Sequence, residues 1–425
     1  MFSRRLKTGY FTLEGLNSFA TVYYFYYFYY FMQKTFGLDN KANLALAALN
    51  GAIYAVFSWG AGRFAQRFGY FTALKLGFTI MPIALAAGLR LHTAGGHIAV
   101  MCATVIGMCF TWPTLEALVS EGEPVGGVRH MVGVYNVVWA GPAAVANFTG
   151  GAMLEKWGPD SLFYVPIAIQ MVQLALTLAL QSQARRRIVE SAGLRSDAEL
   201  GREAAAEAGP SAAVPLPTGA PLLSLPALVP TREATPRRPA RAKSFLRMAW
   251  LANPFAYIAI NTLVAAMPDV ASRLALSTML AGFCCSLWGF ARLGAFFALW
   301  YWSGWHYRFR WLLLAHLVMA GSFAFILLAP NVAVVVLAQI AFGGAIGLIY
   351  YSSLFYSMEL SDTKGEHGGI HEAAIGLGNL AGPAVGATTL QFLPQYANSA
   401  AIAVSLLLLC GLGALAVIWK TGKAA

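Results

Sequence analysis

The chain has 425 residues, of which 58% are hydrophobic and 11% are charged, a composition too apolar for soluble domains of this length. A net charge of +11 would suit a nucleic-acid partner, but the Lys and Arg residues gather at the ends of apolar runs and in one polar stretch. This distribution argues against a nucleic-acid partner and indicates a protein of the lipid bilayer.

Twelve apolar runs are long enough to cross a bilayer as helices, because about 20 residues span the hydrocarbon core. The predicted spans are residues 10–32, 42–61, 71–89, 98–118, 131–153, 161–180, 248–267, 278–301, 311–328, 332–358, 369–393 and 399–419. We therefore expect an all-α integral membrane protein with twelve transmembrane helices in two pseudo-symmetric six-helix bundles.

The polar stretch at residues 181–247 is rich in Ala, Pro, Arg and Glu and has no helical or strand period, a composition typical of disorder. It divides the chain into three predicted parts. Residues 1–183 form an N-terminal six-helix bundle, residues 184–247 a cytoplasmic disordered linker, and residues 248–425 a C-terminal six-helix bundle.

Outside this stretch, twelve Lys and Arg residues fall on the side of the membrane that carries the termini and five on the other side. Because cytoplasmic loops carry the excess of positive charge, both termini and the linker are predicted to be cytoplasmic. We expect a multi-pass protein of the cell (inner) membrane.

The two halves carry a faint internal repeat. Ala140-Gly141-Pro142-Ala143 recurs 241 residues later as Ala381-Gly382-Pro383-Ala384, and His130 matches His371 at the same offset. Two repeated halves are one design of an alternating-access transporter, in which the solute site lies where the halves meet.

The loop after the second span reads Gly62-Arg63-Phe64-Ala65-Gln66-Arg67-Phe68-Gly69-Tyr70. It resembles the loop motif Gly-x-x-x-Asp-Arg-x-Gly-Arg of the major facilitator superfamily. Gly62, Arg67 and Gly69 fit the motif. Gln66 replaces the family's Asp, which removes the charge-assisted part of its hydrogen bonds. The resemblance implies that these four residues act at the cytoplasmic gate.

The fifth span resembles the Gly-Pro motif that many exporters of this family carry there. A proline bends a helix and frees a carbonyl, so Gly141-Pro142 and Gly382-Pro383 are predicted to act as paired hinges, with helix packing alone as an equal alternative. The resemblance further implies that spans 1, 4, 7 and 10 line a central cavity and that spans 2, 5, 8 and 11 form the interface between the halves.

Charged and polar groups inside a membrane destabilise the protein unless they are paired or hydrated, so their presence there indicates a functional role. Glu14, Asn17, Thr21 and Tyr24 share one face of the first span and are predicted to line a water-filled cavity. Buried, Glu14 would favour its neutral form and suit a proton carrier. Alternatively, Glu14 is an interfacial charge near the cytoplasmic end.

Arg292 lies in the middle of the eighth span, where a guanidinium needs an anion or a cluster of carbonyls. Its predicted partner is Glu14 or an anionic group of the solute. Glu116, near the cytoplasmic end of the fourth span, is predicted to pair with Arg67 or Arg129 as a gate latch, with proton carriage as the alternative.

Four amides also lie within predicted spans, where each either lines the cavity or joins helices: Asn136, Asn261, Gln339 and Asn379. Glu359 and Glu372 flank a polar loop and are expected to be solvated. His130, His367 and His371 have no metal-ligand grouping, and the chain carries no nucleotide-binding or hydrolase motif, so we expect neither metal nor cofactor.

These patterns favour a monomeric secondary transporter, not an enzyme, that moves a small organic solute by alternating access and is driven by protons. One alternative is an exporter or facilitator of amphipathic compounds and drugs, which the aromatic run in the first span favours. The other is a membrane-embedded sensor or enzyme.

Overall fold

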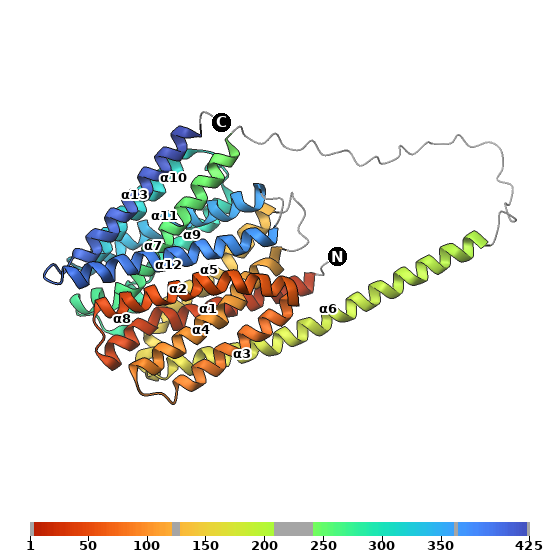
Figure 1. The fold of residues 1–425 in the computed structure, drawn as a ribbon, viewed down its shortest axis with the longest axis horizontal. Helices are drawn as coiled ribbons and strands as arrows, with labels where there is room; N and C mark the ends of the chain where they lie inside the picture. Colours follow the sequence, from red (N-terminus) through yellow and green to blue (C-terminus); the bar gives the residue numbers. More distant parts are fainter. Residues whose placement is uncertain (1–3, 121–127, 208–240, 361–363, 423–425) are drawn as a thin grey trace. The chain divides into compact units, whose positions relative to one another are not determined.

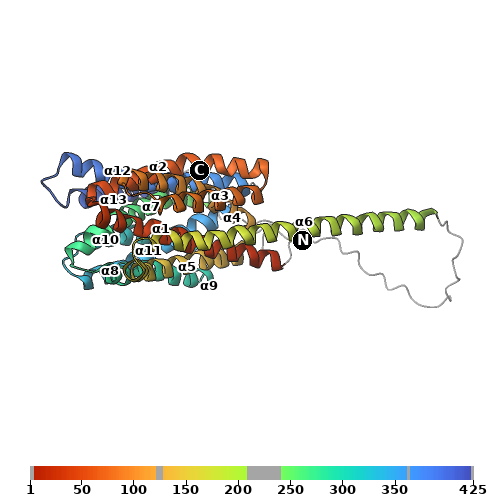
Figure 2. The same ribbon diagram turned by 90° about the horizontal axis from the view of Figure 1, so that it is seen from below.

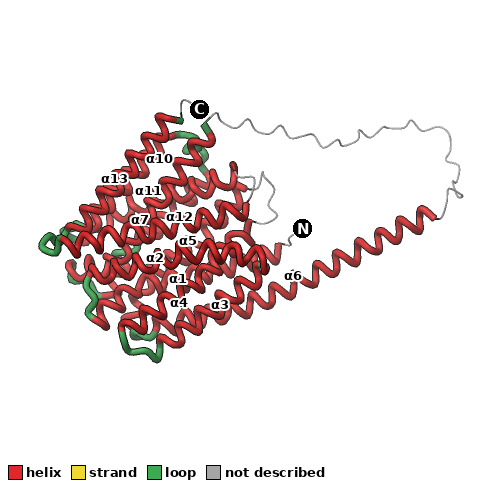
Figure 3. Tube along the Cα trace, in the orientation of Figure 1, coloured by secondary structure: helices red, strands yellow, loops and turns green. Residues whose placement is uncertain are grey.

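The computed structural model describes residues 4–120, 128–207, 241–360 and 364–422, which form thirteen helices and no strand (Figures 1 and 3). The helices are α1 (Arg4–Phe36), α2 (Asn40–Phe68), α3 (Tyr70–Gly88), α4 (Ala94–Ser120), α5 (Val128–Trp157), α6 (Ser161–Glu207), α7 (Ala242–Arg273), α8 (Thr278–Cys284), α9 (Leu287–Tyr301), α10 (Phe309–Leu327), α11 (Val332–Leu360), α12 (Lys364–Phe392) and α13 (Ser399–Thr421). Since α8 and α9 share one span, the predicted all-α fold with twelve spans is confirmed.

Among the described residues, ten of these spans are long and apolar enough to cross a membrane by composition alone. The other two, α1 and α12, lie beside them in the same bundle (Figure 1). Both are more polar than their neighbours because α1 carries a run of tyrosines and α12 begins with charged residues. These two helices also contribute acids to the interior, as described below.

Residues Met1–Leu178 and Arg241–Ala425 make up one compact unit, the helical bundle, and residues Ala179–Ala240 a second unit. The expectation that the whole of 184–247 lacks regular structure is wrong at both ends. α6 continues to Glu207 and α7 begins at Ala242. The extension of α6 contains many Ala, Glu and Arg residues, which are strong helix formers and need no periodic apolar face. Residues 208–240 lie outside the described part.

The eighth span is broken, whereas the sequence predicts one continuous helix at 278–301. α8 ends at Cys284 and α9 begins at Leu287. Side chains from elsewhere satisfy the freed backbone: the Gln339 amide donates to the Cys284 carbonyl (2.9 Å), and the Tyr26 hydroxyl donates to the Cys285 carbonyl (2.7 Å). Irregular backbone at membrane depth is tolerated only where protein groups or water replace its hydrogen bonds in this way.

The link between α2 and α3 is a single residue, Gly69, whose φ of +92° lies in a region that residues with a Cβ rarely adopt. Its N–H donates to the Ala65 carbonyl (2.9 Å) and closes the end of α2. At the other end of α2, the Asp39 carboxylate caps the helix by accepting from the N–H of Ala42 (2.8 Å). Backbone geometry therefore explains the glycine at position 69 of the loop motif.

The N-terminal and C-terminal helices meet along two seams. α2 lies against α12, and α5 lies against α8 and α9, in both views of the bundle (Figures 1 and 2). Small residues allow backbone to approach backbone here: a Cβ added to Gly376 would come within 2.5 Å of Ala55 Cα, and one added to Gly289 within 3.2 Å of Ala144 Cα. These are spans 2, 5, 8 and 11, as the family resemblance implied.

Replacing Gly376 by valine should lower stability, because the seam between α2 and α12 leaves no room for a side chain there. Overpacking of this kind costs about 1–3 kcal/mol, so the melting temperature in detergent should fall. The matched control is Gly60→Val, at a position in α2 where an added Cβ meets no atom within 4 Å. Equal melting temperatures for the two variants would contradict close packing at this seam.

Candidate solute cavity

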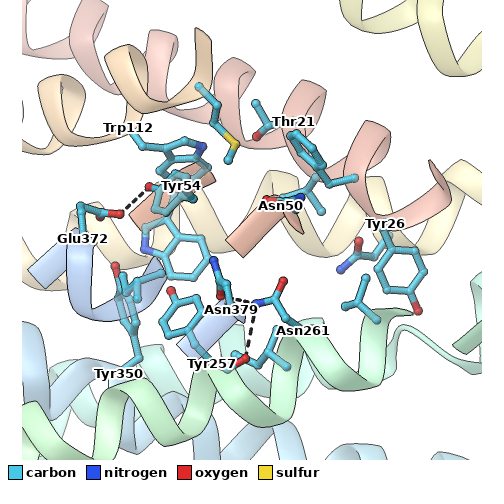
Figure 4. A pocket seen from close by; sticks show the side chains of 18 of the residues that line it. Thr21, Tyr26, Asn50, Tyr54, Trp112, Tyr257, Asn261, Tyr350, Glu372 and Asn379 are labelled. Carbon is cyan, nitrogen blue, oxygen red and sulfur yellow. Dashed lines mark hydrogen bonds between the residues drawn. The ribbon is translucent and has the colours of Figure 1, made fainter. Parts of the chain in front are cut away.

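A cavity of about 200 Å³ lies inside the bundle, between the N-terminal and C-terminal helices (Figure 4). Its lining comes from α1, α2, α4, α5, α7, α9, α11 and α12. Spans 1, 4, 7 and 10, which are α1, α4, α7 and α11, all contribute, in agreement with the family resemblance. Because each half supplies part of the lining, movement of one half against the other would change the cavity.

Aromatic rings form much of the cavity wall. The Trp139 ring lies 5.2 Å from Tyr350 and 6.3 Å from Trp112, and Tyr350 lies 6.3 Å from Tyr257, measured between ring centroids. Their edge-to-face arrangements are typical of packed aromatic clusters. The wall offers flat, apolar faces to a ring or to a cation.

Arg292 faces this cavity from α9 and is only 6% exposed. Its guanidinium carbon lies 4.5 Å from the Trp139 ring centroid and 4.8 Å from that of Trp288, so two indoles flank the charge. Among the described residues it has no carboxylate partner, and its Nε has no hydrogen-bond acceptor. The predicted ion pair with Glu14 is not formed. Cation–π contact replaces only part of the lost hydration, so this charge remains available to an anion.

Glu372 lies at another part of the cavity wall, on α12, and is 5% exposed. The Tyr54 hydroxyl donates to its Oε2 (2.5 Å; dashed in Figure 4), and its carboxyl lies beside that of Glu116 on α4. The expectation that Glu372 is solvated is therefore wrong, because the helix turns this residue inward. Glu359, in contrast, is exposed and accepts from the Tyr307 hydroxyl (2.6 Å).

Glu116 is also buried, and the charged group beside it is an acid, Glu372, where the sequence predicted a cation. Arg67 is exposed and lies over the Phe68 ring, 5.3 Å from its centroid, while the side chain of Arg129 lies outside the described part. Two adjacent buried carboxyl groups disfavour the state in which both are ionised, because two neighbouring negative charges are costly in a low dielectric.

Glu14 lies deeper among the N-terminal helices, fully buried next to Tyr135 of α5. No described residue meets either carboxyl oxygen of Glu14 or the side-chain amide of Asn17 with hydrogen-bond geometry. Glu14 is an electrostatic neighbour of Glu116. Three acids from α1, α4 and α12 thus form one buried group that borders the cavity, and the interfacial alternative for Glu14 does not hold.

The remaining residues of the predicted path fall into two groups. Thr21, Asn261 and Asn379 line the cavity, and the Asn261 amide donates to the Asn379 carbonyl oxygen. Tyr24, Asn136 and Gln339 do not line it. Asn136 accepts a hydrogen bond from the Trp139 indole (3.1 Å), and Gln339 bridges the break between α8 and α9. Tyr24 packs against Phe163. All three therefore support the cavity from behind.

The predicted gate residues occupy the end of α2. Gln66 and Arg67 are exposed, and their side chains form no hydrogen bond or ion pair with the described residues; Gly62 has open space beside it. The predicted hinges differ from each other: Gly141 has open space, whereas Gly382 packs against the Ile258 carbonyl of α7. The gate and hinge roles stay predictions.

The sequence reasoning missed Glu372, Tyr257, Trp139 and Tyr350. For Glu372 a signal exists, because Glu372, Ile375 and Asn379 follow the i, i+3, i+7 spacing of one helix face, and all three line the cavity. The three rings carry no comparable signal, since aromatic residues in apolar spans are more often packed in cores or placed at membrane interfaces.

Substituted-cysteine labelling tests which amides face the cavity. In a background without the five native cysteines, Asn261→Cys should react with a small methanethiosulfonate faster than Asn136→Cys, because Asn261 lines the cavity and Asn136 is fully buried behind Trp139. Mass spectrometry of timed samples measures both rates. Equal rates, or faster labelling at position 136, would contradict the assigned lining.

Comparison with known proteins places these features in a wider group. The solved human organic anion transporter MFSD10 (TETRAN) has a TM-score of 0.64 and 13% identity, with 97% of this chain and 99% of that chain aligned. The nucleoside transporter NupG, solved as a point mutant, has a TM-score of 0.62 and 14% identity, with 99% of each chain aligned. The peptide transporter POT, also solved as a point mutant, has a TM-score of 0.64 and 15% identity, with 98% of this chain and 94% of that chain aligned. At such identities the likeness shows a shared fold alone.

Among curated proteins, the methyl viologen resistance protein SmvA of Salmonella typhimurium is 28% identical over 147 residues, 34% of this chain and 30% of SmvA. The chain thus aligns with about a third of the length of that relative. The sequence model of the Major Facilitator Superfamily matches residues 10–383, most of the chain. With twelve spans, two packed halves and a cavity between them, the chain belongs to the Major Facilitator Superfamily.

Proposed function

We propose that the protein is a secondary active transporter that moves a small organic solute through the central cavity by alternating access, and that protons drive this movement. The observation that carries the proposal is the buried, adjacent pair Glu116–Glu372, because its two carboxyls come from α4 in one half and α12 in the other. Family membership supports transport in general, and the acid pair supports proton coupling in particular.

The pair can hold one or two protons. Among the described residues no cation lies against it; its neighbours include Glu14, the hydroxyl of Tyr54 and the phenol of Tyr135. Burial without a counter-ion favours proton uptake, and exposure to water favours release. When the halves rock apart, the pair separates and each carboxyl meets water, so proton transfer is coupled to the same movement that exposes the solute.

We further propose that the chain lies in the cell (inner) membrane as a monomer, with both termini and the segment between α6 and α7 in the cytoplasm. The excess of Lys and Arg on the side that carries the termini supports this orientation. Twelve spans bring the start of α1 and the end of α13 to one side, as this arrangement requires.

Export of amphipathic compounds is the second candidate. Partial similarity to a methyl viologen resistance protein and the aromatic cavity wall favour it. The two candidates differ in direction and solute rather than in architecture. Transport in proteoliposomes, with and without an imposed pH gradient, separates a proton-driven cycle from simple facilitation.

Glu372→Gln should abolish proton-driven transport, because an amide keeps the size of the side chain but cannot release a proton. The measurement is pH-gradient-driven uptake or efflux in proteoliposomes, with a solute first identified by thermal-shift screening of organic acids, amino acids, nucleosides and drugs. Solute exchange without a gradient should persist in the variant at saturating solute. Glu359→Gln, an exposed acid on α11, is the matched control and should keep full coupling. Full coupling in Glu372→Gln would remove this acid from the mechanism.

Reporter tags test the orientation. Tags inserted on either side of residues 208–240 should both report a cytoplasmic location, because the spans before and after this segment end and begin on the same side. Tags that emerge on opposite faces of the membrane would contradict six spans in each half.

A further inference from the structure

We infer that the cavity selects a bipolar solute, a small molecule with an anionic group at one end and a cationic group at the other, bound with its anion at Arg292 and its cation at Glu372. The inference rests on the proposed function, since it takes the cavity between the halves as the solute site. It goes further by stating which chemistry the solute must carry and in which orientation it lies.

The anionic end follows from the state of Arg292. The residue is only 6% exposed, lines the cavity, and has no carboxylate beside it among the described residues. Trp139 and Trp288 cover it, which leaves the edge of the guanidinium as the available surface. That edge carries N–H donors in a planar fork, which matches a carboxylate or phosphate with two parallel hydrogen bonds.

The cationic end follows from the acid pair. In its singly protonated state the Glu116–Glu372 pair keeps one negative charge, and Glu372 is the member of the pair that lines the cavity. Tyr54 already donates to Glu372 Oε2, so the pair lacks a positive charge rather than a hydrogen bond. An ammonium group of the solute would supply that charge.

Tyr257 lies near both ends. It is an electrostatic neighbour of both Glu372 and Arg292, and these two side chains form no ion pair with each other. Figure 4 shows Tyr350 near Glu372 and Tyr257 farther from it, beside Asn261 and Asn379. Two opposite charges that face one cavity without meeting leave a gap for the body of a solute, and the aromatic wall fits an apolar or ring-shaped body.

Selectivity follows from the cost of an unmatched charge. A solute with one charged end would fill the cavity and leave either Arg292 or Glu372 buried, dehydrated and unpaired. The loss of binding free energy would then include the cost of that unpaired charge as well as the missing contact. A dication would bring a second positive charge towards Arg292. A volume of about 200 Å³ limits the solute to a small molecule, since drug-sized pockets usually measure about 300–1,000 Å³.

The test uses three probes of similar size and different charge with the purified full-length protein. L-Phenylalanine carries both charges, L-phenylalaninamide only the cation, and N-acetyl-L-phenylalanine only the anion. Thermal-shift and equilibrium binding should show phenylalanine bound about tenfold or more tightly than either analogue, since a lost charged contact is worth at least one factor of ten. In Arg292→Gln, phenylalanine and its amide should bind equally. In Glu372→Gln, phenylalanine and its N-acetyl form should bind equally.

Arg292→Lys serves as the second arginine variant, because it keeps the charge and the fold but loses the planar fork; it should bind phenylalanine with intermediate affinity. Trp302→Phe, an exposed position at the end of α9, is the control and should keep the parent's preference. Tighter binding of either singly charged probe, the same preference in all variants, or no binding of any probe would overturn the inference.

Transport measurements keep this inference apart from the proposed function. If phenylalaninamide binds best and exchanges for protons, the bipolar class is wrong and proton-coupled transport stands. If phenylalanine binds with the expected preferences but a pH gradient does not move it, the bipolar class stands and proton coupling is wrong.

Discussion

Charge buried without a counter-charge is the constraint on which the centre of this protein depends. Arg292 and the Glu116–Glu372 pair both lie in surroundings that penalise ionisation, yet they do not neutralise each other. A protein selected for stability alone would replace such groups by apolar side chains at no loss. Arg292 and Glu372 line the same cavity and give it its chemical character, with a base and an acid among aromatic side chains.

The surrounding helices hold these groups in place through contacts that use polar side chains as supports. Asn136 fixes the Trp139 ring that covers Arg292, and Tyr54 fixes the carboxyl of Glu372. Gln339 satisfies the break between α8 and α9, only a few residues before Arg292. Such supports decide the geometry of a site as much as the groups that face the solute.

The seams between the halves supply the other requirement, a structure that can move. At Gly376 and Gly289 the backbones approach so closely that the two halves can slide or rock without repacking large side chains. The acid pair crosses from one half to the other, so the proposed protonation step and the movement of the halves affect the same contact. In the proposed mechanism, the glycines at the seams and the acids beside the cavity therefore serve one transport cycle.

The sequence by itself determined the membrane class, the twelve spans and the family resemblance, because lipid imposes continuous apolar runs and the linear pattern records them. It also singled out Arg292, Asn261 and Asn379, since a polar residue within such a run is visible without coordinates. Only the tertiary structure decided which of these polar residues share a cavity. Glu116 and Glu372 lie 256 positions apart in the chain, and no linear pattern shows that α4 and α12 bring them together. Gln339 and Asn379 both lie within apolar spans. The Gln339 amide satisfies a carbonyl at the break between α8 and α9, whereas Asn379 lines the cavity, because the rotation of each helix within the bundle decides which way its side chains point.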